Sequence, residues 1–549
     1  MTIATLFVTF ALLFSPADIQ INSSIKSGDT LSGTVEIRVT VQSESPVTQV
    51  EFYVNGQLRT ADSSTPYTYV LDTIAEKEGP MEIEIAAFTT DGASKRLKLQ
   101  VTIDNGVSKG VDFHIQNATQ FLQVSKWDEA IQAVRVALKA DPQNNRAKIL
   151  MARAYLGKGQ LDRAQQWAED AVLEQETVEG TELLAGIQVQ RAFTIISRSG
   201  DKGDALKQIA SALKAAVEQK RAALKLRIQS FGEINDSNRL RYIDLLMANH
   251  EYSAARRLLM EKWDEFNPDT AIANRLIYAQ LRSGLMTEAY KTSEIVLKRG
   301  APDANTYALR AAGFAYYRLW DEAQNALREG TFSDPNSPTL MTAAAYVAAM
   351  RGERAAMASQ VTQMLQRQVT DPQAYYYLFV LQYMAGQYED SRENFRKTLI
   401  QDPLLYEAYV ERGYHALINA RSLPSGLASD RDLLMDQAKS FFEIALAAKP
   451  DCAEALNGLA IVHLYQGNTA DAVRMAEAAT AAGPEQPWAW FTYSAALGAA
   501  RRAADAIKAV DKAGELDKVI LRGRSTPTVD QVWDYTWRYG RQPVLIPPK

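Results

Sequence analysis

The sequence predicts a multidomain chain: a small all-β sandwich followed by a long all-α solenoid that coils into a superhelix. Polar and apolar residues alternate over short stretches between residues 35 and 103, the pattern of half-buried strands. From residue 111 onward the period becomes helical, and alanines recur every 34 residues. The recurring positions are Ala130 and Ala164, then Ala255, Ala289 and Ala323, then Ala438, Ala472 and Ala506. A repeat of this length indicates a solenoid, and 549 residues exceed one ordinary core.

Composition excludes several classes of protein. The net charge of -5 provides no basic field for nucleic acid, so we expect none as a partner. Cys452 is the single cysteine, which excludes an intramolecular disulfide. Because no cluster of basic residues surrounds it in sequence, we interpret it as a small buried side chain and not as a reactive thiol.

The first 17 residues have the pattern of a secretory signal. An apolar stretch runs from Ile3 to Phe14, and Ser15 and Ala17 follow at the small-residue spacing of a cleavage site. No Lys or Arg precedes the stretch, so a buried first strand is the alternative. No apolar run reaches the ~18 residues of a membrane span. We therefore predict a signal peptide over 1–17 and an exported chain that is periplasmic, cell-surface or secreted, with cleavage at Ala17 left open.

Residues 18–104 are expected to form the sandwich. Asn55-Gly56 and Asp91-Gly92 lie between alternating stretches, where two-residue hairpin turns with φ > 0 are expected. Several short strands in under 90 residues favour two antiparallel sheets. The run from Val50 to Gly56, followed by Thr65-Pro66-Tyr67, resembles the bacterial Ig-like modules of secreted proteins. That resemblance implies a spacer or an adhesion element.

A polar linker over 105–110 leads into repeats over 111–522. The first unit, from Val111 to Asn144, has small, aromatic and proline residues at fixed places: Ala118, Phe121, Ala130, Ala137 and Pro142. It resembles the tetratricopeptide repeat, a pair of antiparallel helices. The resemblance implies about eleven units, with an irregular stretch at 179–235 and an insertion at 419–432. Within the irregular stretch we expect a long helix, rich in Lys and Arg, from about Gly203 to Ser230.

The segment 523–549 is not a repeat. Thr528 and Gln531 have the spacing of a capping box, and Gly540 fits the position after a helix end. Apolar residues fall on one face between them, so we predict an amphipathic helix that caps the solenoid, followed by an extended tail. The alternative is that its aromatic residues form a docking peptide for a partner.

No motif of catalytic or metal chemistry is recognisable. The four histidines are far apart in sequence, and no zinc-ligand spacing, phosphate-binding loop or nucleophile elbow occurs. We predict a protein without catalytic residues, cofactor or metal.

Function is therefore expected in the concave groove of the solenoid. In the tetratricopeptide family the first helix of each unit lines that groove, and the resemblance gives eight candidate residues for binding a protein or an extended peptide: six at groove positions of the register and two, Arg412 and Tyr465, beside them. They are Tyr376, Tyr383, Arg412, Tyr414, Asn457, Tyr465, Trp488 and Phe491. Aromatic rings can bury a peptide's apolar side chains while Asn pairs with its backbone. Alternatively, these aromatic residues only pack neighbouring units together.

Two functional hypotheses follow. In the first, the chain is a non-catalytic exported scaffold that binds a protein or peptide in the groove. In the second, the Ig-like module attaches to glycan or cell wall, and the repeats are a spacer. Tyr53, Tyr67 and Tyr69 are the aromatic candidates for the second. We favour the first, because about three quarters of the chain builds the groove.

Overall fold

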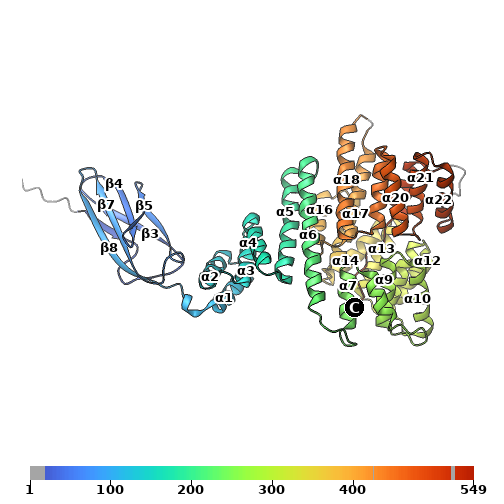
Figure 1. Ribbon diagram of the computed structural model, residues 1–549, viewed down its shortest axis with the longest axis horizontal. Helices are drawn as coiled ribbons and strands as arrows, with labels where there is room; N and C mark the ends of the chain where they lie inside the picture. Colours follow the sequence, from blue (N-terminus) through green and yellow to red (C-terminus); the bar gives the residue numbers. More distant parts are fainter. Residues whose placement is uncertain (1–18, 425, 521–525, 549) are drawn as a thin grey trace, which may run out of the picture. The chain divides into compact units, whose positions relative to one another are not determined.

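The computed structural model describes residues 19–424, 426–520 and 526–548. The expected signal peptide therefore lies outside the described residues. The chain divides between Glu174 and Gln175 into two compact units (Figure 1). No helix among the described residues is long and apolar enough to cross a membrane.

The first unit begins with a sandwich of two sheets. One has the strand order β1-β3-β6 and the other β2-β8-β7-β4-β5, and all neighbours are antiparallel except β2 and β8. The strands are β1 (Gln20–Ser23), β2 (Thr30–Leu31), β3 (Thr34–Gln42), β4 (Val47–Val54), β5 (Gln57–Asp62), β6 (Tyr67–Asp72), β7 (Gly79–Thr89) and β8 (Ser94–Ile103). Ile37, Val50, Phe52 and Ile85 are fully buried between the sheets, so the alternating residues form the core as predicted.

The two expected hairpin turns differ. Asn55 and Gly56 both have positive φ, at 48° and 80°, as a two-residue turn with the twist of the strands requires. Between β7 and β8, only Gly92 has a positive φ. Asp91 instead accepts hydrogen bonds from the Thr89 hydroxyl and the Ala93 amide, which makes a longer connection than the predicted turn.

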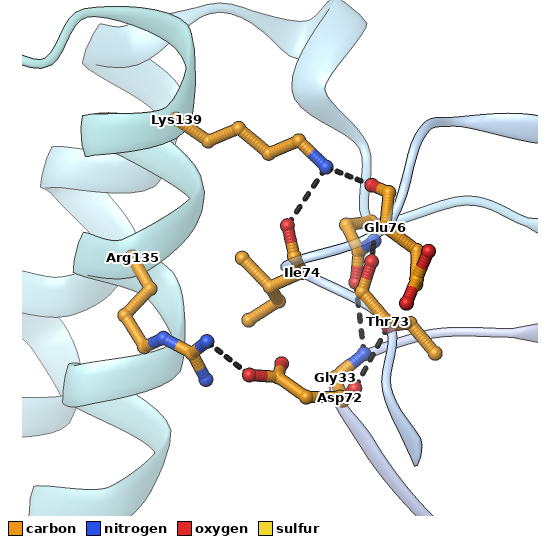
Figure 2. A network of polar contacts seen from close by, with 8 residues as sticks. Gly33, Asp72, Thr73, Ile74, Glu76, Arg135 and Lys139 are labelled. Atoms are coloured by element: carbon orange, nitrogen blue, oxygen red, sulfur yellow. Dashed lines mark hydrogen bonds and ion pairs between the residues drawn. The ribbon is translucent and has the colours of Figure 1, made fainter. Parts of the chain in front are cut away.

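The sandwich is fastened to the first helices of its own unit. These are the short 3-10 helix η1 (Val107–Lys109), α1 (Val111–Gln123), α2 (Trp127–Ala140), α3 (Asn145–Gly157) and α4 (Leu161–Glu174). Arg135 on α2 pairs with Asp72, and Lys139 donates to the carbonyl oxygens of Ile74 and Glu76 (Figure 2). The side chain of Thr73 donates to the Gly33 carbonyl, which fixes the loop that receives these two cations. Arg135 and Lys139 thus bind one turn of the sandwich from successive turns of α2.

The second unit is built from helix pairs. Its helices are α5 (Val178–Ser199), α6 (Gly203–Gln229), α7 (Arg239–Ala248), α8 (Tyr252–Met260), α9 (Thr270–Arg282), α10 (Met286–Arg299), α11 (Ala304–Tyr316), α12 (Trp320–Ser333), α13 (Pro338–Arg351), α14 (Arg354–Gln366), α15 (Pro372–Met384), α16 (Tyr388–Gln401), α17 (Tyr406–Ser422), α18 (Ala428–Ala448), α19 (Ala453–Tyr465), α20 (Thr469–Ala482), α21 (Pro487–Ala499), α22 (Ala503–Leu516) and α23 (Val529–Tyr539). Seven of the eight periodic alanines are fully buried, and Ala289 is 3% exposed. Small side chains at these positions allow the close approach of paired helices.

Both irregular stretches of sequence are absorbed as longer helices. α5 and α6 have 22 and 27 residues, and α6 agrees closely with the predicted basic helix. Most of its cations are engaged within the unit: Lys220 and Arg227 pair with Glu182, and Arg221 donates to the Ala448 carbonyl. The expected insertion at 419–432 is accommodated by longer helices, α17 and α18, of 17 and 21 residues.

α23 has the predicted capping box, in which Thr528 and Gln531 bond each other's backbone amides. Gly540 ends the helix at φ -84°, outside the left-handed region. A glycine is required there for another reason, because a Cβ atom would stand 2.6 Å from the Thr536 carbonyl oxygen.

Candidate functional site

The second unit closes on itself after about six repeats. Thr287 and Glu485 are hydrogen bonded and lie 198 residues apart, close to six periods of 34 residues. Arg412 on α17 pairs with Asp201 before α6 at 2.5 Å, across 211 residues. Lys214 on α6 pairs with Glu443 on α18. The superhelix therefore encloses its inner face, which we define as the side formed by the first helices of the repeats, α9, α11, α13, α15, α17, α19 and α21.

Arg282, at the end of α9, makes contacts across this enclosed interior. Its guanidinium pairs with Glu407 on α17, and both side chains are only 6% exposed. Arg282 also donates to the Tyr252 hydroxyl at 3.1 Å and lies over the ring of Tyr406, 5.1 Å from its centroid. Lys449 donates to the Arg282 carbonyl oxygen. We call Tyr252, Arg282, Tyr406, Glu407 and Lys449 the closing cluster.

The inner face is occupied by a segment of the same chain. We define residues 526–548 as the resident segment; it comprises α23 and a run over 541–548 that is neither helix nor strand. Within that run Val544, Leu545 and Ile546 are at most 3% exposed. α23 contacts α19 and α21. The extended tail predicted for this region thus lies inside the solenoid.

Side chains of the inner face hold the extended backbone. The Tyr346 hydroxyl, on α13, donates to the Arg541 carbonyl oxygen at 2.9 Å. Thr342, one turn earlier on α13, accepts from the Ile546 amide at 3.1 Å. Arg282 reaches the Pro543 carbonyl oxygen at 3.4 Å. Backbone contacts of this kind recognise an extended polypeptide whatever its side chains are.

One buried ion pair fixes the side chains of the segment. The Arg541 guanidinium binds Glu411 on α17 through two hydrogen bonds of 2.9 and 3.1 Å and lies 4.0 Å from the centroid of the Trp537 ring. Although burial opposes ionisation of Glu411, Arg541 and His415 hold the pKa of this carboxyl group well below its usual range. Arg541 is therefore the residue of the segment that matches a fixed charge of the inner face.

Six of the eight candidate residues lie at or near the resident segment. Asn457 donates to the Thr536 hydroxyl at 3.3 Å, and Tyr465 donates to Asp530 at 2.7 Å. The rings of Tyr414 and Phe491 contact aromatic rings of the segment. Trp488 shares an apolar cluster with the segment, and Tyr376 lies in the apolar core beside it, near the charge of Arg541. Tyr376, Tyr414, Asn457 and Trp488 are at most 4% exposed, so they are part of the packed interior.

Tyr383 and Arg412, the other two candidates, line a separate cavity of about 470 Å³. Its wall also includes Asp201 and His415. The Tyr383 ring stacks on His415 at 3.3 Å between centroids, and its hydroxyl donates to Asn419 at 2.8 Å.

Sequence reasoning missed three charged residues of the inner face. Arg282, Glu407 and Glu411 lie on helices that read as apolar or mixed, and their partners are about 125 to 130 residues away. A signal was present in the run Val544-Leu545-Ile546, which is apolar and bounded by Pro543 and Pro547, as is unusual for a solvated tail.

His415 provides a test of the interior by pH. Burial lowers the pKa of His415 to about 4 although the neighbouring Glu411 opposes the shift. The unfolded chain protonates this group near 6.5, so it binds more protons than the folded chain below that pH. Stability should fall as pH drops from 6.5 to 4, with a contribution from His415 of roughly 1.4 kcal/mol per pH unit. Urea unfolding at each pH measures it. His415→Gln should reduce the slope, and an unchanged slope would contradict the assignment.

Comparisons with known proteins agree with the two halves of the fold. Residues 22–95 match the family model of the bacterial Ig domain, and residues 121–185 and 458–517 match models of the tetratricopeptide repeat. Both predicted resemblances are thereby confirmed. A comparison with curated proteins gives no match.

Similar solved structures include the APC/C hetero-tetramer Cut9-Hcn1, at 13% identity over 78% of this chain and 84% of that chain, with a TM-score of 0.40. Yeast Tom70 is 15% identical over 78% and 95% of the two chains, with a TM-score of 0.33. The fibronectin(III)-like modules of Clostridium thermocellum CbhA are 25% identical over 15% and 94%, with a TM-score of 0.14. TM-scores of this size carry no information on function.

Proposed function

We propose that this chain, which joins a bacterial Ig domain to tetratricopeptide repeats, is an exported, non-catalytic scaffold for protein–protein interaction. Its solenoid binds an extended peptide segment of a partner on the inner face. Tetratricopeptide repeats themselves indicate a protein-interaction scaffold. Export and the use of the inner face are the finer parts of the proposal.

One observation carries the proposal: the inner face already holds a polypeptide. Tyr346, Thr342 and Arg282 bond the backbone of the resident segment, and Glu411 binds its arginine. These are the two parts of peptide recognition, since backbone bonds hold any extended chain and a buried charge selects a side chain.

A binding experiment tests this directly. Leu545→Asp places a carboxylate in an apolar site and should weaken the seating of the resident segment without changing the inner face. A fluorescent peptide of residues 526–548 should then bind the full chain that carries Leu545→Asp, as measured by anisotropy. Adding Glu411→Gln to that chain should weaken binding by about tenfold or more, because a charge-assisted pair is lost.

The control is Leu427→Asp, the same substitution at a side chain that is 42% exposed. It should leave the resident segment in place and bind the peptide much more weakly than the chain with Leu545→Asp does. Helical circular dichroism verifies folding, and Ile546→Ala is a milder second variant. Failure of both variants to bind the peptide while they remain folded would overturn the proposal.

The Ig-like module has few exposed aromatic residues that could recognise a glycan. Tyr67 is 6% exposed, and Tyr69 packs against Phe52 with ring centroids 5.6 Å apart. Tyr53 keeps a partly exposed ring, but its hydroxyl donates to Glu51 at 2.5 Å. The glycan hypothesis would thus depend on two half-buried rings, those of Tyr53 and Tyr69, so we place recognition in the solenoid.

Export is tested at the amino terminus. Expressed in a bacterial host, the chain should lose residues 1–17 and begin near Asp18. Amino-terminal sequencing of protein from the envelope and medium fractions measures this. Recovery of an intact Met1 from the cell interior alone would remove export from the proposal.

A further inference from the structure

The resident segment leaves several buried polar groups of the inner face without a hydrogen-bond partner in the described parts of the chain. Buried polar atoms in native proteins are nearly always hydrogen bonded. Nevertheless, the Tyr414 hydroxyl, the Asn457 Oδ1 and the Trp488 Nε1 have no hydrogen-bond partner among the described residues. All three belong to first helices of the inner face, at or near α23. The Glu407 Oε2, in the closing cluster, also lacks a partner.

An unpaired buried polar group costs free energy that a better-matched ligand recovers. The bond between Asn457 and Thr536 is long, at 3.3 Å, and the contact of Arg282 with the Pro543 carbonyl is longer, at 3.4 Å. In contrast, the Arg541–Glu411 pair and the buried run 544–546 are well matched. The segment therefore combines strong anchors with polar positions that it leaves open.

We propose that the resident segment is an intramolecular competitor, and that the partner is a polypeptide segment of similar chemistry that displaces it. The partner's segment is extended where it crosses α13 and α17, places an arginine against Glu411, and carries aliphatic side chains three to five residues later. It also offers hydrogen-bonding groups to Tyr414, Asn457 and Trp488. This inference rests on the proposed function, because it requires an inner face that binds peptides.

The covalent attachment of the resident segment determines how strongly it competes with a free peptide. A covalently attached segment acts at an effective concentration in the millimolar range, so a free peptide of equal intrinsic affinity exchanges with it only when present at similar concentration. A partner that also pairs the open polar groups would exchange at lower concentration. Loss of the arginine from a competing peptide should abolish exchange, because Glu411 would be left buried without its cation.

Hydrogen exchange read by mass spectrometry on the full wild-type chain tests displacement. The probe is an isotope-labelled peptide of residues 526–548 at millimolar concentration, and a matched peptide carries the change equivalent to Arg541→Ala. With the wild-type peptide, exchange at the amides of residues 541–546 should become at least tenfold faster. With the altered peptide it should not change.

Each of the other outcomes contradicts either this inference or the proposed function. If 541–546 stays protected while the chain with Leu545→Asp binds the peptide, the inner face binds peptides but the segment is a permanent part of the fold, and this inference is wrong. If that variant and Ile546→Ala bind no peptide, the proposed function fails as well. If protection is lost without added peptide as the chain dimerises by light scattering, the occupant is a second copy and the proposed partner is wrong.

Discussion

Arg282→Ala should destabilise the second unit by about 3–5 kcal/mol, because it leaves the buried carboxylate of Glu407 without its cation. Both side chains are 6% exposed, so water cannot replace the lost partner. The same change removes a donor to Tyr252 and the contact with Pro543. Urea unfolding followed by circular dichroism measures the loss.

A second substitution separates the charge from the packing. Arg282→Ala combined with Glu407→Gln removes the stranded charge and should recover part of the stability, in the manner of a double-mutant cycle. Arg256→Ala is a matched control, since Arg256 is 28% exposed and its partner Glu288 46%. It should cost less than about 1 kcal/mol. Equal losses for Arg282→Ala and Arg256→Ala would contradict the role given to the closing cluster.

Gly458→Ala should destabilise the chain by roughly 2 kcal/mol, although alanine is the better helix former by about 1 kcal/mol. Gly458 on α19 and Gly413 on α17 lie against the ring of Phe442, which is fully buried on α18. A Cβ atom at Gly458 would stand 2.6 Å from two ring carbons, and one at Gly413 would stand 2.5 Å from another. The ring fills the space that the two glycines leave.

Gly186→Ala is the control for this prediction. Gly186 lies within α5, and a Cβ atom there would have nothing within 4 Å. The substitution should therefore stabilise the chain by about 0.5–1 kcal/mol through helix propensity alone. Phe442→Leu should lessen the effect of Gly458→Ala in the double variant. A neutral or stabilising Gly458→Ala would show that the packing around Phe442 adjusts.

The sequence alone determined the architecture, because the periodicity of strands and helices can be recognised within short stretches of residues. Alternation of apolar residues located strands such as β3 and β7, and the 34-residue spacing of alanines located the helix pairs. The capping box at Thr528 and Gln531 located the start of α23. Each of these signals depends on residues within a few turns of helix or one hairpin, so each can be recognised without knowledge of distant contacts.

Only the tertiary structure decided what occupies the inner face. Nothing in the local pattern around Arg541 shows that its partner is Glu411, 130 residues earlier, or that Arg282 meets Glu407 across 125 residues. Each pair spans fewer than four periods of 34 residues, so it reaches across the interior of the superhelix, whose curvature depends on small rotations summed over every helix pair. The tail after α23, which the sequence predicted only to be extended, is buried inside the solenoid, because the enclosed inner face gives Val544, Leu545 and Ile546 apolar surroundings.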